Sequence, residues 1–236
     1  MANHYFQFKQ FTIHQDRCAF KVGTDGVLLG AEASVSSVER VLDVGAGTGL
    51  ISLMIAQRSM AMITAIEPDT GSFSQLVENV SESPWRERIK VLNVTLQEYS
   101  LSGCNFDLIV SNPPYFTDSI RNPDPRISST RHNYNLPQTE LLSGVSKLLS
   151  ENGIFQVIMP YAEGTVLIAE AASFGLFCIE LLKIKPLPSS PVRRLIITFS
   201  RQKGNLRERF LTIEHGQRHD FTTEYIELTK DFYLKF

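Results

Sequence analysis

From Arg40 onward, short apolar runs alternate with stretches of helical period, and this alternation limits the possible folds more than any other feature of the chain. The expected strands cover residues 41–44, 62–66, 89–94, 106–110, 154–159, 177–184 and 195–199, and the expected helices 50–58, 72–80, 138–149 and 164–174. Strands that alternate with helices of this length form a mostly parallel sheet with helices on both faces. We therefore predict an α/β, Rossmann-like sheet of seven strands, with ligands beyond the carboxyl ends of the strands.

The ends of the chain depart from this alternation. At about 150 residues per domain, 236 residues fit a single large domain. Alternating apolar residues in 6–8 and 18–22, with a turn at 15–16, predict an N-terminal hairpin, followed by a helix, within residues 1–39. We assign 40–203 to the catalytic core and 204–236 to a C-terminal extension whose last residues, 225–236, form a capping helix.

Composition excludes several classes of protein. Apolar residues make up 43% of the chain and charged residues 20%, as in ordinary globular proteins. The chain has no apolar run long enough to span a membrane and no secretory leader, which favours the cytoplasm. Its three cysteines are scattered, and His215 and His219 have no third ligand nearby, so we expect neither disulfides nor a bound metal.

A glycine-rich turn follows the first core strand. Asp43 ends that strand and leads into Gly45, Gly47 and Gly49, which open the next helix. The Gly-x-Gly-x-Gly spacing is neither the dinucleotide fingerprint nor a P-loop. An acid, Glu67, ends the next strand, where a carboxylate can accept protons from both ribose hydroxyls of a nucleoside. The glycine turn and Glu67 together predict a nucleoside-binding site.

This combination resembles the class I S-adenosylmethionine-dependent methyltransferases over residues 20–200. The resemblance implies S-adenosylmethionine as cofactor, lying across the ends of the first two strands, with its adenine near the end of the third. The cofactor-binding residues that it implies here are Asp43, Gly45, Gly47, Gly49, Glu67, Pro68, Thr95 and Leu96.

The sequence Asn112-Pro113-Pro114-Tyr115 comes directly after a buried strand. Two prolines end the strand pairing and fix the backbone. The Asn112 side chain and the Pro113 backbone supply two carbonyl acceptors, and Tyr115 supplies a ring. Two acceptors and an aromatic face suit a planar amino group. We therefore assign Asn112, Pro113, Pro114 and Tyr115 to catalysis, with Asn112 also beside the cofactor.

This tetrapeptide resembles the signature of methyltransferases that act on nitrogen conjugated to a planar system. Three interpretations compete: an adenine in RNA, a glutamine amide in a release factor, or a non-enzymatic binding module. A guanine N2 in ribosomal RNA is a further substrate of this signature. Only about 40 residues precede the glycine turn, which counts against the glutamine enzymes, because these carry a helical N-terminal domain.

Flanking segments narrow the resemblance further. Residues 20–30, the Asn-Pro-Pro-Tyr turn, 188–194 and 228–234 occur in this order. Together they resemble the bacterial tRNA1(Val) (adenine(37)-N6)-methyltransferase family across nearly the whole chain. The resemblance implies a tRNA anticodon stem-loop as partner, and a segment that closes over cofactor and target through Lys21, Thr24, Asp25 and Gly26.

Basic residues are unevenly distributed. The net charge is -2, yet residues 183–209 hold eight basic residues and one acidic. Such a segment can bind a phosphate backbone locally. Arginines also fill the irregular stretch 117–136. Our candidate RNA-binding residues are Arg126, Arg131, His132, Arg193, Arg194 and Arg201. The sequence does not determine the oligomeric state; a monomer is favoured.

Overall fold

The computed structural model describes residues 4–18, 20–114 and 136–236. Tyr115, Arg126, Arg131 and His132 lie outside these residues.

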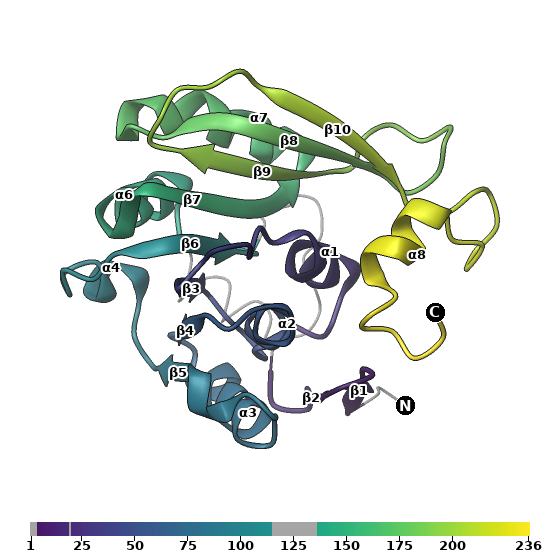
Figure 1. The fold of residues 1–236 in the computed structure, drawn as a ribbon, viewed down its shortest axis with the longest axis horizontal. Helices are drawn as coiled ribbons and strands as arrows, with labels where there is room; N and C mark the ends of the chain where they lie inside the picture. Colours follow the sequence, from purple (N-terminus) through teal and green to yellow (C-terminus); the bar gives the residue numbers. More distant parts are fainter. Residues whose placement is uncertain (1–3, 19, 115–135) are drawn as a thin grey trace.

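One eight-stranded sheet forms the centre of the molecule (Figure 1). In spatial order its strands are β10 (Arg207–Thr212), β8 (Phe177–Lys185), β9 (Arg194–Ser200), β7 (Leu149–Pro160), β6 (Phe106–Ser111), β3 (Arg40–Val44), β4 (Met62–Ile66) and β5 (Ile89–Leu92). Strand β9 alone runs antiparallel to its neighbours β7 and β8. The predicted, mostly parallel α/β sheet is confirmed.

Helices cover both faces of the sheet. The helices α1 (Thr24–Glu32), α2 (Leu50–Arg58), α3 (Thr70–Ser81) and α8 (Thr223–Thr229) contribute to one apolar core. The helices α4 (Leu96–Tyr99), α6 (Gln138–Leu148) and α7 (Tyr161–Ala171) contribute to a second core on the opposite face. Strand residues divide between the two by parity: Val41 belongs to the first core and Leu42 to the second, because successive side chains point to opposite faces.

The predicted count of seven strands is wrong, because β10 adds an eighth at the sheet edge. Its sequence, Arg-Glu-Arg-Phe-Leu-Thr, lacks a strand pattern, and its first four residues are exposed. Arg207 and Arg209 instead find carboxylate partners on other elements, at Glu180 of β8 and Glu32 of α1. An edge strand buries little apolar surface, so hydrophobic periodicity could not reveal it. The assigned C-terminal extension, 204–236, therefore includes part of the sheet.

An N-terminal hairpin forms, but its second strand and its turn are not the predicted ones. Strand β1 (Tyr5–Gln7) pairs with β2 (Thr12–His14), and the turn closes where Phe8 N–H donates to Phe11 O at 2.9 Å. The predicted second strand, 18–22, is not found at its described residues, Cys18 and 20–22. The backbone of the residues after β2 is held by side chains: Arg17 N–H donates to Gln75 Oε1 of α3, and Val22 N–H to Gln15 Oε1. This tertiary support carries the chain to the start of α1.

Candidate active site

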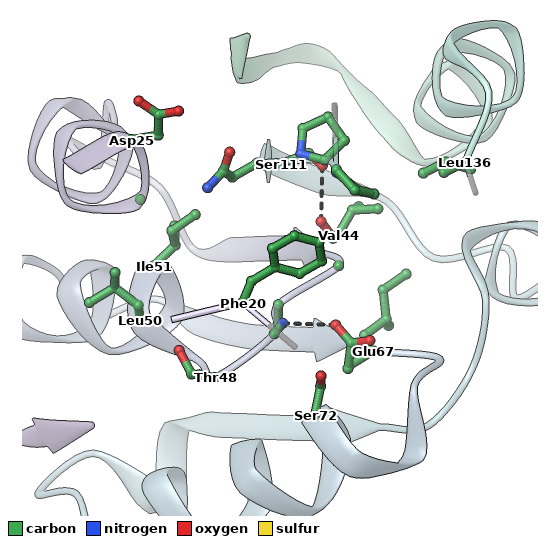
Figure 2. A pocket seen from close by; sticks show the side chains of 18 of the residues that line it. Phe20, Asp25, Val44, Thr48, Leu50, Ile51, Glu67, Ser72, Ser111 and Leu136 are labelled. Atoms are coloured by element: carbon green, nitrogen blue, oxygen red, sulfur yellow. Dashed lines mark hydrogen bonds between the residues drawn. The ribbon is translucent and has the colours of Figure 1, made fainter. Parts of the chain in front are cut away.

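A cavity of about 810 Å³ opens at the carboxyl ends of β3, β4 and β6 (Figure 2). Its size suits a nucleoside together with a second planar group. One end is bounded by the glycine turn, Glu67 and residues 94–97, and the other by residues 111–114, Pro160 and Arg194. Residues 20–26 form a further wall. The predicted location of the site, beyond the carboxyl ends of the strands, agrees with this geometry.

The glycine turn needs its glycines for backbone reasons. Gly45, Gly47 and Gly49 have φ values of 70°, 56° and 86°, a region that other residues enter at a cost. The turn is fixed by N–H groups of Gly45 and Ala46, both of which donate to Ile66 O at the end of β4. A Cβ on Gly45 or Gly47 would meet nothing within 4 Å, whereas one on Gly49 would lie 2.7 Å from Leu76. The first two glycines therefore border open space, and the third permits close helix packing.

Glu67 lies in the cavity wall with its carboxylate fixed by backbone. Gly47 N–H donates to Oε2 at 2.8 Å and Asp69 N–H to Oε1 at 2.9 Å. The residue is only 8% exposed. Burial raises the pKa of Glu67 to about 7, against the lowering effect of the two hydrogen bonds. The site thus holds a carboxylate whose remaining lone pairs can accept hydroxyl protons.

Asp43 is the second buried acid here. Ser52 Oγ donates to its Oδ2 at 2.7 Å, and burial raises the pKa of the Asp43 carboxyl to about 6. Within the described part of the chain, Oδ1 has no hydrogen-bond partner. A fully buried carboxylate oxygen without a donor is costly. Asp43 is 0% exposed and is not among the residues that line the cavity, so the structure does not bring this predicted cofactor-binding residue to the cavity surface.

A further part of the cavity wall comes from the residues after β5. Thr95 caps α4 and forms a capping box with Glu98, which fixes Thr95 and Leu96 at the cavity. Asn93 was not singled out from the sequence. Its Nδ2 donates to Glu67 O at 2.7 Å and to Pro68 O at 3.1 Å, and so ties the end of β5 to the end of β4. A lone asparagine after a strand gave no signal of this role.

The Asn-Pro-Pro corner leaves the sheet at the end of β6. Ser111 Oγ donates to Val44 O at 2.9 Å, which joins the ends of β6 and β3 (Figure 2). Asn112 is half-buried, Pro113 buried and Pro114 exposed, and all three line the cavity. A Cβ on Gly26 would lie 3.8 Å from Asn112 Nδ2. The start of α1 therefore stands directly beside the Asn112 amide.

Residues 20–26 contain all four residues that were predicted to close over cofactor and target. Lys21, Thr24, Asp25 and Gly26 all line the cavity, as does Phe20, which the sequence analysis passed over. Phe20 is 44% exposed although it is a large apolar residue. Asp25 has a partner that the sequence did not indicate: its Oδ2 accepts from Arg194 Nε at 2.7 Å.

The candidate RNA-binding residues separate in space. Arg194 lines the cavity, and Arg193 is exposed beside it. Arg201 follows the opposite end of β9, at the amino edge of the parallel strands, because β9 is antiparallel. Its guanidinium donates to Ser146 O and Leu149 O at the end of α6. The structure does not bring Arg201 to the cavity.

Several basic residues of the segment 183–209 form ion pairs with carboxylates in the folded protein. Lys183 pairs with Glu208, Arg207 with Glu180, and Arg209 with Glu180 and Glu32. Within the described ranges, no group of three metal-ligating side chains occurs, and no helix is long and apolar enough to cross a membrane.

Comparison with known proteins agrees with the fold and the cavity. A model of the methyltransferase small domain family matches residues 22–159. A crystal structure of a predicted O-methyltransferase from Agrobacterium tumefaciens superposes with a TM-score of 0.67 over 88% of this chain and 96% of the other, at 20% identity. The fold and the site define the protein as a class I methyltransferase.

Full-length relatives are more specific. The chain is 46% identical to a tRNA1(Val) (adenine(37)-N6)-methyltransferase of Bacteroides fragilis over the whole length of both proteins. A protein of the same name from Trichodesmium erythraeum is 45% identical, again over both whole lengths. The chain belongs to the tRNA1(Val) (adenine(37)-N6)-methyltransferase family.

Proposed function

We propose that this protein transfers a methyl group from S-adenosylmethionine to the N6 amino group of an adenine in tRNA, and that the target is adenosine 37 of a valine tRNA. The observation that carries the proposal is that one cavity joins the Glu67 carboxylate to the Asn112–Pro114 corner. A nucleoside cofactor and a planar amine can thus share one enclosed space. The names of the full-length relatives support tRNA and its adenine as substrate.

The residues present fit the cofactor. The positive φ values of Gly45 and Gly47 and the open space beside them allow a ligand to approach the backbone closely. Glu67 offers carboxylate oxygens to ribose hydroxyls, and Thr95 and Leu96 offer a wall for the adenine. When bound, S-adenosylmethionine supplies an activated methyl group on a sulfonium sulfur.

The chain's own contribution to catalysis centres on the Asn-Pro-Pro corner. The Asn112 side-chain carbonyl and the Pro113 backbone carbonyl would accept the two N–H groups of the target amine. The lone pair of that amine is delocalised into the ring, so acceptors that favour a pyramidal nitrogen stabilise the charge that develops on it. Pro113 and Pro114 fix the backbone, and positioning supplies much of the remaining rate. Stacking on Tyr115 stays a prediction from the sequence.

Two other substrates share this corner motif: a glutamine amide in a release factor, and a guanine N2 in ribosomal RNA. A transfer assay separates them. The protein is incubated with methyl-labelled S-adenosylmethionine and, in parallel, with unmodified total tRNA, ribosomal RNA or a release factor. We expect label in tRNA alone, recovered after digestion as N6-methyladenosine. Label in protein, or as N2-methylguanosine, would refute the proposed substrate, and no label in any substrate would refute methyl transfer.

A further inference from the structure

Asn79 joins two backbone segments that are distant in sequence. It lies on α3 and is only 1% exposed. Its Nδ2 donates to Thr48 O and to His14 O, both at 2.9 Å, and its Oδ1 accepts from His14 N–H at 2.8 Å. A buried amide with such partners is costly to replace, because its loss leaves backbone groups without hydrogen bonds in the interior.

One of the two segments borders the cavity. Thr48 lines the cavity between Gly47 and Gly49, and Asn79 fixes its carbonyl to α3. The same helix packs on the turn at the next residue, where a Cβ on Gly49 would lie 2.7 Å from Leu76. Figure 2 shows Thr48 on the side of the cavity where α3 lies. A ligand at the glycine turn therefore restrains a backbone that α3 holds directly.

The other segment leads back to the cavity. His14 ends β2, and the Oε1 atom of the next residue, Gln15, accepts from Val22 N–H at 2.8 Å. Val22 lines the cavity in the wall formed by residues 20–26. Hydrogen bonds thus connect the glycine turn, through Asn79 and the end of β2, to a second wall of the same cavity.

We propose that Asn79 is a positioning residue: cofactor bound at the glycine turn fixes, through Asn79, the wall 20–26 that receives the target nucleotide. This proposal rests on the proposed function. His14 is not among the residues that line the cavity, so the restraint reaches the wall through the protein. Two ligands that need the same ordered segment favour each other, because the first to bind has already ordered it.

Gln75 provides a matched control. It lies one turn before Asn79 on the same face of α3 and is 0% exposed. Its Oε1 accepts from Arg17 N–H at 3.0 Å, and its Nε2 donates to Glu78 Oε2 at 2.8 Å. These bonds support the residues after β2, and neither of them reaches the glycine turn. Removing this amide tests the cost of a buried polar loss on α3 without cutting the proposed connection.

The first measurement is calorimetric affinity for S-adenosylhomocysteine. Asn79→Ala should bind about five- to tenfold more weakly, because Thr48 O loses its donor. Gln75→Ala should stay within about twofold of the unchanged protein, because its bonds are separate from the turn. At saturating S-adenosylmethionine, kcat with tRNA should remain at least about tenfold lower in Asn79→Ala. Excess cofactor restores occupancy of the turn and does not restore the connection to the wall.

The second measurement is amide hydrogen exchange with and without saturating S-adenosylhomocysteine. The reporter is Gln15 N–H, which donates to His4 O at 2.8 Å and does not contact Asn79 in a hydrogen bond. In the unchanged protein and in Gln75→Ala, the ligand should slow its exchange at least about threefold. In Asn79→Ala the ligand should have no effect on it. A merely structural amide would change the exchange rate equally with and without ligand.

The proposal is overturned if the ligand slows Gln15 exchange equally in Asn79→Ala and in the unchanged protein, or has no effect in the unchanged protein. Equal S-adenosylhomocysteine affinity of Asn79→Ala and Gln75→Ala would also overturn it. Asn79→Ser carries the same predictions if Asn79→Ala does not fold, because a serine hydroxyl is too short to bridge both segments. If the protein binds S-adenosylhomocysteine and methylates no tRNA, the proposed function fails, and the exchange measurement still decides the role of Asn79.

Discussion

The pKa of Glu67 results from two opposing effects. Two backbone N–H groups favour its ionised form, and burial disfavours it; burial is the larger effect and raises the pKa of Glu67 to about 7. Burial likewise raises the pKa of Asp43 to about 6, and the hydrogen bonds with Ser52 offset only part of this increase. Both acids therefore bind a proton more tightly in the folded chain than in the unfolded one.

This difference makes the stability of the ligand-free protein depend on pH. A carboxyl whose pKa is raised by folding stabilises the protein below its ordinary pKa, and this stabilisation is lost as pH rises through the folded value. We expect the Tm to fall between pH 5 and pH 8, as measured by thermal unfolding in constant ionic strength. The Tm of the Glu67→Gln variant should fall less steeply near pH 7. A Tm that rises over this range, or an unchanged slope in the variant, would contradict the assignment.

Asn112 provides the second test at a single side chain. Asn112→Ala removes one of the two proposed acceptors for the target amine, so turnover should drop at least about tenfold, where each tenfold corresponds to about 1.4 kcal/mol. Cofactor affinity, measured by calorimetry, should stay largely intact. Asn152→Ala makes the same substitution at an exposed residue in the first part of β7, at the opposite edge of the sheet, and should change neither value. Near-normal turnover in Asn112→Ala would exclude the assigned role.

At the scale of helices and strands, Arg201 adds a polar link between the ends of α6, β7 and β9. Arg201 follows β9 and donates to Ser146 O and Leu149 O at the end of α6. A cation at a helix carboxyl end satisfies carbonyls that have no partner within the helix and interacts favourably with the helix dipole. The sequence suggested RNA for this residue, and the fold gives it a structural partner.

The two roles of Arg201 make different predictions. If the contact to α6 is its main one, Arg201→Ala should lower the free energy of unfolding by about 1.5–3 kcal/mol and leave RNA affinity unchanged. Arg207→Ala is the control, because this side chain is 69% exposed and a surface pair contributes about 0–1 kcal/mol. Urea unfolding and RNA binding measure both. Weaker RNA binding at unchanged stability would restore the RNA role.

At the scale of the whole molecule, the N-terminal hairpin is hydrogen-bonded to the C-terminal residues of the chain. Lys9 N–H donates to Phe232 O at 2.8 Å, and Lys9 Nζ donates to Lys230 O and Phe236 O. The C-terminal tail also accepts from Gln57 of α2, and α8 packs on α1. Figure 1 shows β1 beside the C-terminal tail, next to α1 and α2. The helix that begins at the cavity is thus held from outside by the last residues of the chain.

Phe232 tests this closure. It is 2% exposed and packs in the same core as α1 and α2. Phe232→Ala should cost about 3–5 kcal/mol of stability through the cavity that it leaves. Leu234→Ala, two residues later and 56% exposed, should cost less than about 0.5 kcal/mol. Urea unfolding of both variants checks the difference. A small effect at Phe232 would mean that the tail is not part of the cooperative core.

The sequence alone determined the features that depend on local pattern. Seven of the eight strands, the helices 50–58 and 138–148, the glycine turn and the Asn-Pro-Pro corner follow from hydrophobic period and from backbone restrictions of glycine and proline. Each is set by neighbours within about ten residues, so no knowledge of the fold was needed.

Tertiary structure decided every feature that depends on partners distant in sequence. The edge strand β10, the different hairpin strands, the Asn93 bridge, the ion pairs of the basic segment and the Asp25–Arg194 pair all rest on contacts between separate elements. Charged and polar side chains choose their partners by distance in space, and neither composition nor period encodes that distance. The sequence therefore predicted several of the residues that line the cavity, and only the fold showed which charges are paired there.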